Sequence, residues 1–103
     1  WGFQRPLRRA VRWDGVLPRQ WGAGPITPQV IRALADYAAQ HRTAGTPFDI
    51  IKYGVTGGRD LAQDCSLVQE YASAGATWWI EEIFPGRGTL NQIRQRINSG
   101  PSR

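Results

Sequence analysis

Several residue types are scarce in this 103-residue sequence, and each shortage excludes a class of protein. It has one cysteine, Cys65, and one histidine, His41, so neither an internal disulfide nor a Cys/His metal site can be built from it. No apolar run approaches the roughly 20 residues of a membrane span, and no secretory signal opens the chain. The composition therefore predicts a soluble, cytoplasmic protein with no membrane contact.

Methionine is absent altogether. A native chain begins with methionine, which processing usually removes only ahead of a small residue, and Trp1 is large. We therefore expect residues 1–103 to be a single unit of a longer polypeptide whose start lies upstream.

The residues that are present indicate a folded domain with a basic surface. Apolar residues make up 41% and aromatic residues 11%, which is too apolar for a disordered chain, and the net charge is +5. The segment "RPLRRAVR" places four arginines in eight residues. A phosphate backbone or an acidic partner would suit this charge, but neither an aromatic RNA-binding signature nor zinc ligands accompany it. We favour a solvated helix face over specific nucleic-acid binding.

Hydrophobic spacing predicts that helices and strands alternate along the chain. Thr27 is placed to cap a helix with Pro28 at its first position, and Asp60 is placed to cap another. Runs rich in β-branched and aromatic residues predict the strands. The expected order is a helix in "RPLRRAVRWDG", a short strand in "GVLP", a helix over 28–43, a strand near 48–54, a helix over 60–74, a strand near 77–83 and a helix in "TLNQIRQRINSGP".

Apolar side chains at helical spacing form a stripe on each of the last two helices. Cys65 lies on one stripe and is expected to be an inert core thiol, whereas His41 is expected to face water. Trp78 and Trp79 are expected to pack between strand and helices. The stripes are Leu61, Cys65, Val68, Tyr71 and Ala72 on the helix over 60–74, and Leu90, Ile93 and Ile97 on the last helix.

The alternation is typical of βα units around a parallel sheet. Parallel strands are covered on both faces or line a barrel, so near-continuous apolar runs such as "DIIKY" and "TWWI" fit them. Glu81 and Glu82 fall late in one predicted strand, and residues 53–59 fall late in the other. Both groups should therefore approach the carboxyl edge of the sheet, where α/β proteins hold ligands.

Three segments, "RPLRRAVRWDGVLP", "FDIIKYGVTGG" and "YASAGATWWIEEI...IRQRINSGPSR", resemble in this order the carboxyl-terminal portion of luciferase-like flavin- or deazaflavin-dependent oxidoreductases, the bacterial luciferase superfamily. The resemblance covers almost the whole chain and implies a partial (β/α)8 barrel made of its last βα units. It also implies FMN or a deazaflavin at the carboxyl ends of the strands, with hydride transfer or oxygen activation as the chemistry. The strand that helps hold the cofactor phosphate in these relatives would precede Trp1, and the position of Tyr53 is often acidic in them.

Four residues are candidates for cofactor binding. Gly57, Gly58 and Arg59 precede a helix and could hold a phosphate through free N–H groups and the helix dipole, although two glycines after a strand more often form a turn. Glu81 could face the substrate or cofactor, although a strand-end glutamate paired with an arginine is commoner. Catalytic residues are not identified by the sequence.

The expected function is therefore a segment of a luciferase-like monooxygenase or oxidoreductase, with the isolated chain inactive and holding no cofactor tightly. The alternative is a small non-catalytic α/β binding or assembly module. In either case the open strand edges predict self-association as a homodimer, with Trp78 or Trp79 in the interface.

Overall fold

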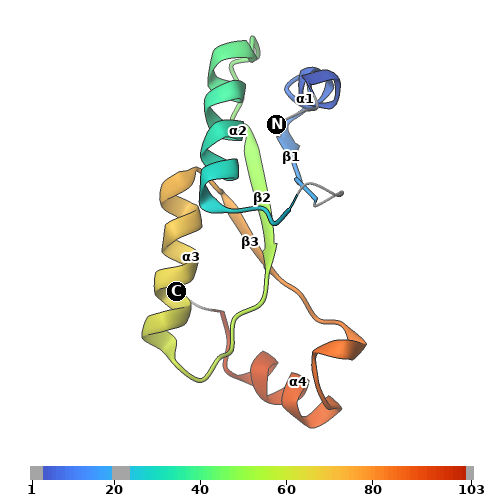
Figure 1. The fold of residues 1–103 in the computed structure, drawn as a ribbon, viewed down its shortest axis with the longest axis vertical. Helices are drawn as coiled ribbons and strands as arrows, with labels where there is room; N and C mark the ends of the chain where they lie inside the picture. Colours follow the sequence, from blue (N-terminus) through green and yellow to red (C-terminus); the bar gives the residue numbers. More distant parts are fainter. Residues whose placement is uncertain (1–3, 20–23, 102–103) are drawn as a thin grey trace.

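The structure, a computed structural model, describes residues 4–19 and 24–101 (Figure 1). None of the described helices is long and apolar enough to cross a membrane. The element order confirms the predicted alternation, and a short 3-10 helix, η1, adds to it. The elements are α1 (Gln4–Ala10), β1 (Gly15–Val16), α2 (Pro28–His41), β2 (Asp49–Gly54), α3 (Leu61–Ala74), β3 (Trp78–Glu81), η1 (Pro85–Arg87) and α4 (Leu90–Asn98).

The three strands form one parallel sheet in the order β1-β2-β3. Ile51 of β2 lies beside Trp78 of β3, and Gly54 lies beside Glu81. The predicted parallel pairing of the strands near 48–54 and 77–83 is therefore confirmed, and the chain is a mixed α/β protein. Within the described residues, the outer edges of β1 and β3 have no partner strand.

Helix α2 begins as the sequence predicts. The Thr27 hydroxyl accepts the N–H of Val30 at 3.3 Å, and Pro28 occupies the first turn, where its missing N–H leaves no helical hydrogen bond unmade. The helix ends at His41, two residues before the predicted boundary. The His41 side chain is exposed, as expected, and its ring stacks on Tyr37.

The hydrophobic core lies between the helices and one face of the sheet. Ile31 of α2 is fully buried and packs in a cluster with Leu7 of α1, Leu34, Ile50 of β2 and Ala74 of α3. Figure 1 shows α2 and α3 on the same side of β2 and β3. The sheet is thus covered by helices on this face.

Helix α3 departs from its predicted stripe in its first half. Asp60 caps the helix as predicted, by accepting the N–H of Gln63 at 3.1 Å. Leu61, however, is 66% exposed, and Cys65 is only half-buried, so the expected core position of its thiol is wrong. Asp64 is buried instead, because the polar loop before the helix draws its carboxylate inward.

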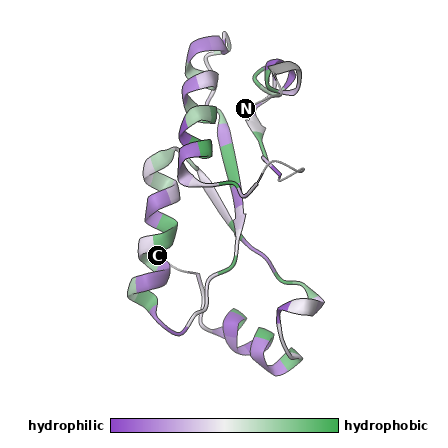
Figure 2. Ribbon diagram, viewed as in Figure 1, coloured by the Kyte–Doolittle hydropathy of each residue, from purple (hydrophilic) through white to green (hydrophobic). Residues whose placement is uncertain are grey.

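Helix α4 lies beyond the carboxyl ends of β2 and β3 (Figure 1), and hydrophobic and hydrophilic residues are mixed along it (Figure 2). Its N-cap Thr89 forms a capping box with Gln92. Leu90 is 69% exposed and Ile97 is 60% exposed, whereas Arg96 is the buried residue of the helix. A charged side chain, rather than the apolar stripe, therefore anchors α4 to the sheet.

The face of the sheet opposite the helices is apolar and partly exposed. Trp79 packs against Tyr71 of α3 with ring centroids 5.7 Å apart, so it lies on the helix-covered face. Strand alternation then directs Trp78 to the other side, where it is 59% exposed, and the prediction that both tryptophans pack against helices is wrong for Trp78. We call this side the open face; it is formed by Ile51, Tyr53, Trp78 and Ile80.

The molecule is elongated, with extents of 45 × 27 × 20 Å. Its radius of gyration is 15.3 Å, whereas a compact domain of this length has about 13 Å. The excess arises because a single layer of helices covers a narrow sheet and α4 projects past the strand ends (Figure 1).

Candidate functional site

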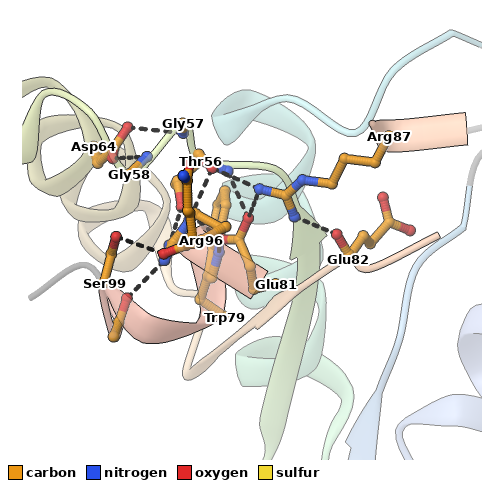
Figure 3. Close-up of polar contacts among 12 residues, drawn as sticks. Thr56, Gly57, Gly58, Asp64, Trp79, Glu81, Glu82, Arg87, Arg96 and Ser99 are labelled. Carbon is orange, nitrogen blue, oxygen red and sulfur yellow. Dashed lines mark hydrogen bonds and ion pairs between the residues drawn. The ribbon is translucent and has the colours of Figure 1, made fainter. Parts of the chain in front are cut away.

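A cleft of about 440 Å³ opens at the carboxyl ends of the strands, between the loop that follows β2, Arg87 and helix α4 (Figure 3). A second cavity of about 350 Å³ lies beside it, lined by Trp79, Glu81 and Ile83 among others, and Arg96 lines both. This is the edge at which parallel α/β sheets bind ligands. It is also the edge at which the sequence predicted a site.

Thr56 joins the loop after β2 to the end of β3. The residue is 1% exposed, and its N–H donates to Glu81 Oε2 at 2.7 Å while its hydroxyl donates to Glu81 Oε1 at 2.5 Å. The same hydroxyl accepts from Arg96 Nη2 at 2.6 Å. A buried hydroxyl that both donates and accepts fixes the loop against the strand end.

Two arginines from different elements neutralise Glu81. Arg87 of η1 places Nη2 2.9 Å from Glu81 Oε2, and Arg96 of α4 places Nη2 3.4 Å from Oε1. Both guanidinium groups also donate to the carbonyl oxygen of Thr56, at 2.7 and 3.0 Å. Arg87 donates further to the Glu82 carbonyl, and Arg96 to the Gly100 carbonyl at 2.7 Å. Figure 3 shows the two side chains approaching Thr56 and Glu81 from opposite sides.

The environment of Glu81 keeps its carboxyl group ionised. Burial raises its pKa, but hydrogen bonds from the Thr56 hydroxyl and amide, from Trp79 and from Arg87 together outweigh burial, and the pKa falls below its ordinary value. The Trp79 indole N–H donates to Glu81 Oε1 at 3.2 Å. A carboxylate held in this state serves as an electrostatic anchor and is a poor proton donor near neutral pH.

The two glycines that the sequence marked for phosphate binding hold a carboxylate of the chain itself. The N–H of Gly57 donates to Asp64 Oδ1 at 3.2 Å, and the N–H of Gly58 donates to Asp64 Oδ2 at 2.7 Å. Gly58 has a φ of +74°, which favours glycine. The loop therefore has the geometry of an anion-binding nest, and Asp64 occupies it.

The structure brings the four predicted residues to one edge, although not into one cavity. Gly57, Gly58 and Arg59 line the larger cleft, whereas Glu81 lines the smaller cavity. The alternative interpretation of Glu81, a strand-end glutamate paired with an arginine, matches its geometry. Catalysis was not assigned to any residue by the sequence, and these contacts do not assign it either.

Sequence reasoning missed the residues that hold the site together, Thr56, Asp64, Arg87 and Arg96. Asp64 had a usable signal, because it lies at the fourth position of α3, six residues after two glycines whose N–H groups need partners. Arg96 had a weaker signal, since it is one of two arginines in "IRQR" and its partner lies 40 residues away. Long-range pairs of this kind are not visible in local spacing.

The arrangement is suited to holding an anion. Arg59, Arg87 and Arg96 line the larger cleft, whereas no described aspartate or glutamate lines it, so the charged groups of its lining are all positive. The described residues include no group of His, Cys, Asp and Glu side chains that could bind a metal ion. The smaller cavity adds apolar surface from Trp79 and Ile83, against which a planar ring could pack.

The chain was compared with protein-family models, with curated proteins and with solved structures, and no match was found in any of the three comparisons.

Proposed function

We propose that the chain is a segment of a luciferase-like oxidoreductase that uses FMN or a deazaflavin for hydride transfer or oxygen activation. The proposal starts from the resemblance of the three quoted segments. In the structure it is supported by one observation: a positively charged cleft lies at the carboxyl edge of a parallel sheet, beside an apolar cavity. In this proposal the segment forms the last βα units of a (β/α)8 barrel.

Arg59 is the residue we expect to contact the cofactor phosphate. It is exposed at the mouth of the larger cleft, at the start of α3, where the helix dipole also favours an anion. Gly57 and Gly58 contribute by shaping the loop, since Asp64 occupies their N–H groups. Glu81 contributes by fixing Arg87 and Arg96 at the cleft wall.

The chain alone is expected to bind flavin weakly. A flavin site buries most of the ligand and provides several polar anchors. Here the larger cleft is bounded on one side by α4 and the loop after β2, and the open face of the sheet is not covered by described residues. We therefore expect the isolated chain to be inactive and to have a low affinity for the cofactor phosphate.

Nuclear magnetic resonance titration of the 103-residue chain tests this proposal. FMN should shift the amide resonances of residues 57–59 progressively, without saturation at micromolar ligand, and riboflavin, which lacks the phosphate, should shift them much less. Arg59→Ala should abolish the FMN-induced shifts. Arg8→Ala, which removes another exposed arginine, on α1, should leave them unchanged.

Three outcomes would contradict the proposal. Equal shifts with FMN and riboflavin would show that the phosphate is not recognised. Shifts confined to α1 would show that the net charge of the chain, rather than the cleft, attracts FMN. Saturable binding at low micromolar FMN would show that the pocket is more complete than the segment interpretation allows.

The second candidate function is a non-catalytic assembly module. It is favoured by the open face, where Trp78 is 59% exposed on a parallel sheet. A module requires a stable contact through this face and no response of the cleft to FMN. The titration above therefore distinguishes the two functions, because self-association is expected for both.

A further inference from the structure

The open face is the most unusual surface of the molecule. Its four side chains, Ile51, Tyr53, Trp78 and Ile80, come from adjacent strands in register, and Trp78 is the most exposed of them. Parallel sheets in proteins are normally covered on both faces. A contiguous exposed apolar patch on a sheet marks a site of contact with another surface.

We propose that the open face binds the open face of a second copy of this chain, with the two sheets packed face to face about a two-fold axis perpendicular to the strands. This inference concerns the 103-residue chain and does not rest on the cofactor. It replaces the broader expectation of an interface at Trp78 or Trp79 with one face and one tryptophan.

The charges at the two ends of β2 are complementary in this arrangement. Asp49 begins the strand and, by alternation with Ile51, shares the open face. At the other end, the Arg19 guanidinium lies 5.7 Å from the centroid of the Tyr53 ring. A two-fold axis near Ile51 reverses the second copy, so Asp49 of each copy approaches Arg19 of its partner.

The arginines of α1 do not oppose this contact. Leu7 of α1 belongs to the core cluster on the helix-covered face, so the helix lies on the far side of the sheet from the proposed interface. By contrast, pairing two copies through α4 would bring together two helices on which the exposed charged residue, Arg94, is basic. Charge therefore favours the open face over the stripe of α4 as the contact between copies.

The size of the face predicts a weak dimer. Three strands about 4.8 Å apart and a central strand of about 20 Å give a face of a few hundred Å² per copy. Stable interfaces bury about 800 Å² per partner. We therefore expect a reversible dimer that forms as the protein concentration rises from micromolar to millimolar.

Sedimentation equilibrium over this concentration range tests the proposal. The wild-type chain should shift from monomer to dimer, and Trp78→Asp should weaken the association by at least about tenfold, since a central tryptophan dominates such interfaces. Leu90→Asp is the matched control, because Leu90 is similarly exposed at 69% but lies on α4. It should leave the dissociation constant unchanged. A wild-type chain that stays monomeric and folded, or a dimer disrupted by Leu90→Asp and not by Trp78→Asp, would overturn the proposal.

Chemical cross-linking gives a test that does not depend on the folding of the Trp78 variant. Ile51→Cys in a Cys65→Ser background should form a covalent dimer with a short bismaleimide, because the axis passes near Ile51 and sheets packed face to face lie about 10 Å apart, farther than a disulfide spans. Ala39→Cys in the same background places an exposed thiol on α2, away from the open face, and should cross-link much more slowly. Equal rates for the two variants would show random collision and would overturn the proposed geometry.

Discussion

Thr56 and Glu81 make the carboxyl edge a single polar unit. Thr56 is buried, and it binds a carboxylate with its amide and hydroxyl while its carbonyl accepts from two guanidinium groups. Each of Arg87 and Arg96 thereby has both a charged and a neutral partner. Charge-assisted hydrogen bonds that share partners in this way are stronger than isolated ones.

Replacing the Glu81 carboxylate should destabilise the fold, because Arg87 and Arg96 then lose their charged partner. Removing one partner of a fully buried ion pair costs about 3–5 kcal/mol, because the remaining charge is left without compensation. The Arg96 side chain is 8% exposed and that of Glu81 is 22% exposed. Glu81→Gln should therefore lower the free energy of unfolding by about 2 kcal/mol, less than a fully buried pair would. Denaturation in urea measures this loss, with Glu82→Gln as the neighbouring control expected to cost less than about 1 kcal/mol.

The same carboxylate predicts the response to acid. The pKa of Glu81 in the folded chain lies below its ordinary value of 4.5, so its contribution to stability is present above that pH. The contribution is lost as the pH falls through the lower, folded-state pKa. The difference in unfolding free energy between the wild type and Glu81→Gln should shrink as the pH is lowered below about 4.5. A difference that stays constant down to pH 2 would show that Glu81 does not titrate with unfolding.

At the level of elements, β3 packs against α3 through the Trp79 side chain, which lies over Gly54 of β2. Gly54 lies on the helix-covered face, and a Cβ added there would overlap the Trp79 ring. Trp79 in turn packs on Tyr71, and the Lys52 ammonium group lies 5.0 Å from the Tyr71 ring centroid and 5.7 Å from that of Trp79. The position of the indole therefore depends on the absence of a side chain at residue 54.

Gly54→Ala should destabilise the fold through this contact. Overpacking of a filled site typically costs about 1–3 kcal/mol. Gly45→Ala is the control, because nothing lies within 4 Å of its Cβ and its φ is not positive, so it should be neutral or slightly stabilising. Adding Trp79→Phe to Gly54→Ala should recover part of the loss, because it removes the ring atoms in contact. Thermal unfolding of the single and double variants checks this; no recovery would place the strain elsewhere.

The elements themselves could be predicted from the sequence because their signals are local. Thr27, Pro28 and Asp60 mark helix starts through chemistry within one turn, and the structure agrees with each. The side chains that position α3 and α4 could not be predicted in this way. Asp64 becomes a buried anchor because the N–H groups of the loop just before α3 need partners, and Arg96 becomes one because the Thr56 carbonyl, 40 residues away, needs a donor.

At the level of the whole molecule, the core is small for the length of the chain. The buried apolar residues among those described are Leu7, Ile31, Leu34, Ala38, Ile50 and Ala74, all on the helix side. The Trp78 side chain and the α4 stripe remain outside it. Hydrogen bonds and ion pairs therefore contribute more to holding the ends of the molecule to the sheet than they do in an α/β domain whose sheet is covered by helices on both faces.

Arg42 holds the amino-terminal segment, α1 and β1, to the rest of the fold through hydrogen bonds. Its side chain is 7% exposed and donates to the carbonyl oxygens of Val11 at 3.2 Å, of Trp13, and of Thr46 at 3.0 Å. The guanidinium also lies 5.0 Å from the Phe48 ring centroid. One residue at the end of α2 thus connects the end of α1 to the loop that leads into β2.

Arg42→Met keeps much of the side-chain length and removes the donors. Several carbonyl oxygens then lose a charged hydrogen-bond donor at once, and each such bond contributes about 1.5–3 kcal/mol, so a total loss of about 3 kcal/mol is expected. Arg32→Met is the control, because Arg32 is exposed and donates to the Ser73 carbonyl at 2.8 Å; it should cost less than about 1 kcal/mol.

Hydrogen exchange then shows whether Arg42 stabilises only the contact of the amino-terminal segment with β2 or the whole sheet. In Arg42→Met the amide of Asp49, which donates to the Asp14 carbonyl at 2.8 Å, should lose protection because it joins β2 to the amino-terminal segment. The amide of Glu82 donates to the Gly54 carbonyl at 2.8 Å and joins the end of β3 to β2; it should keep its protection. Equal loss at both amides would mean that Arg42 supports the whole sheet. A selective loss at Asp49 would show that α1 and β1 open as a unit while β2 and β3 stay paired.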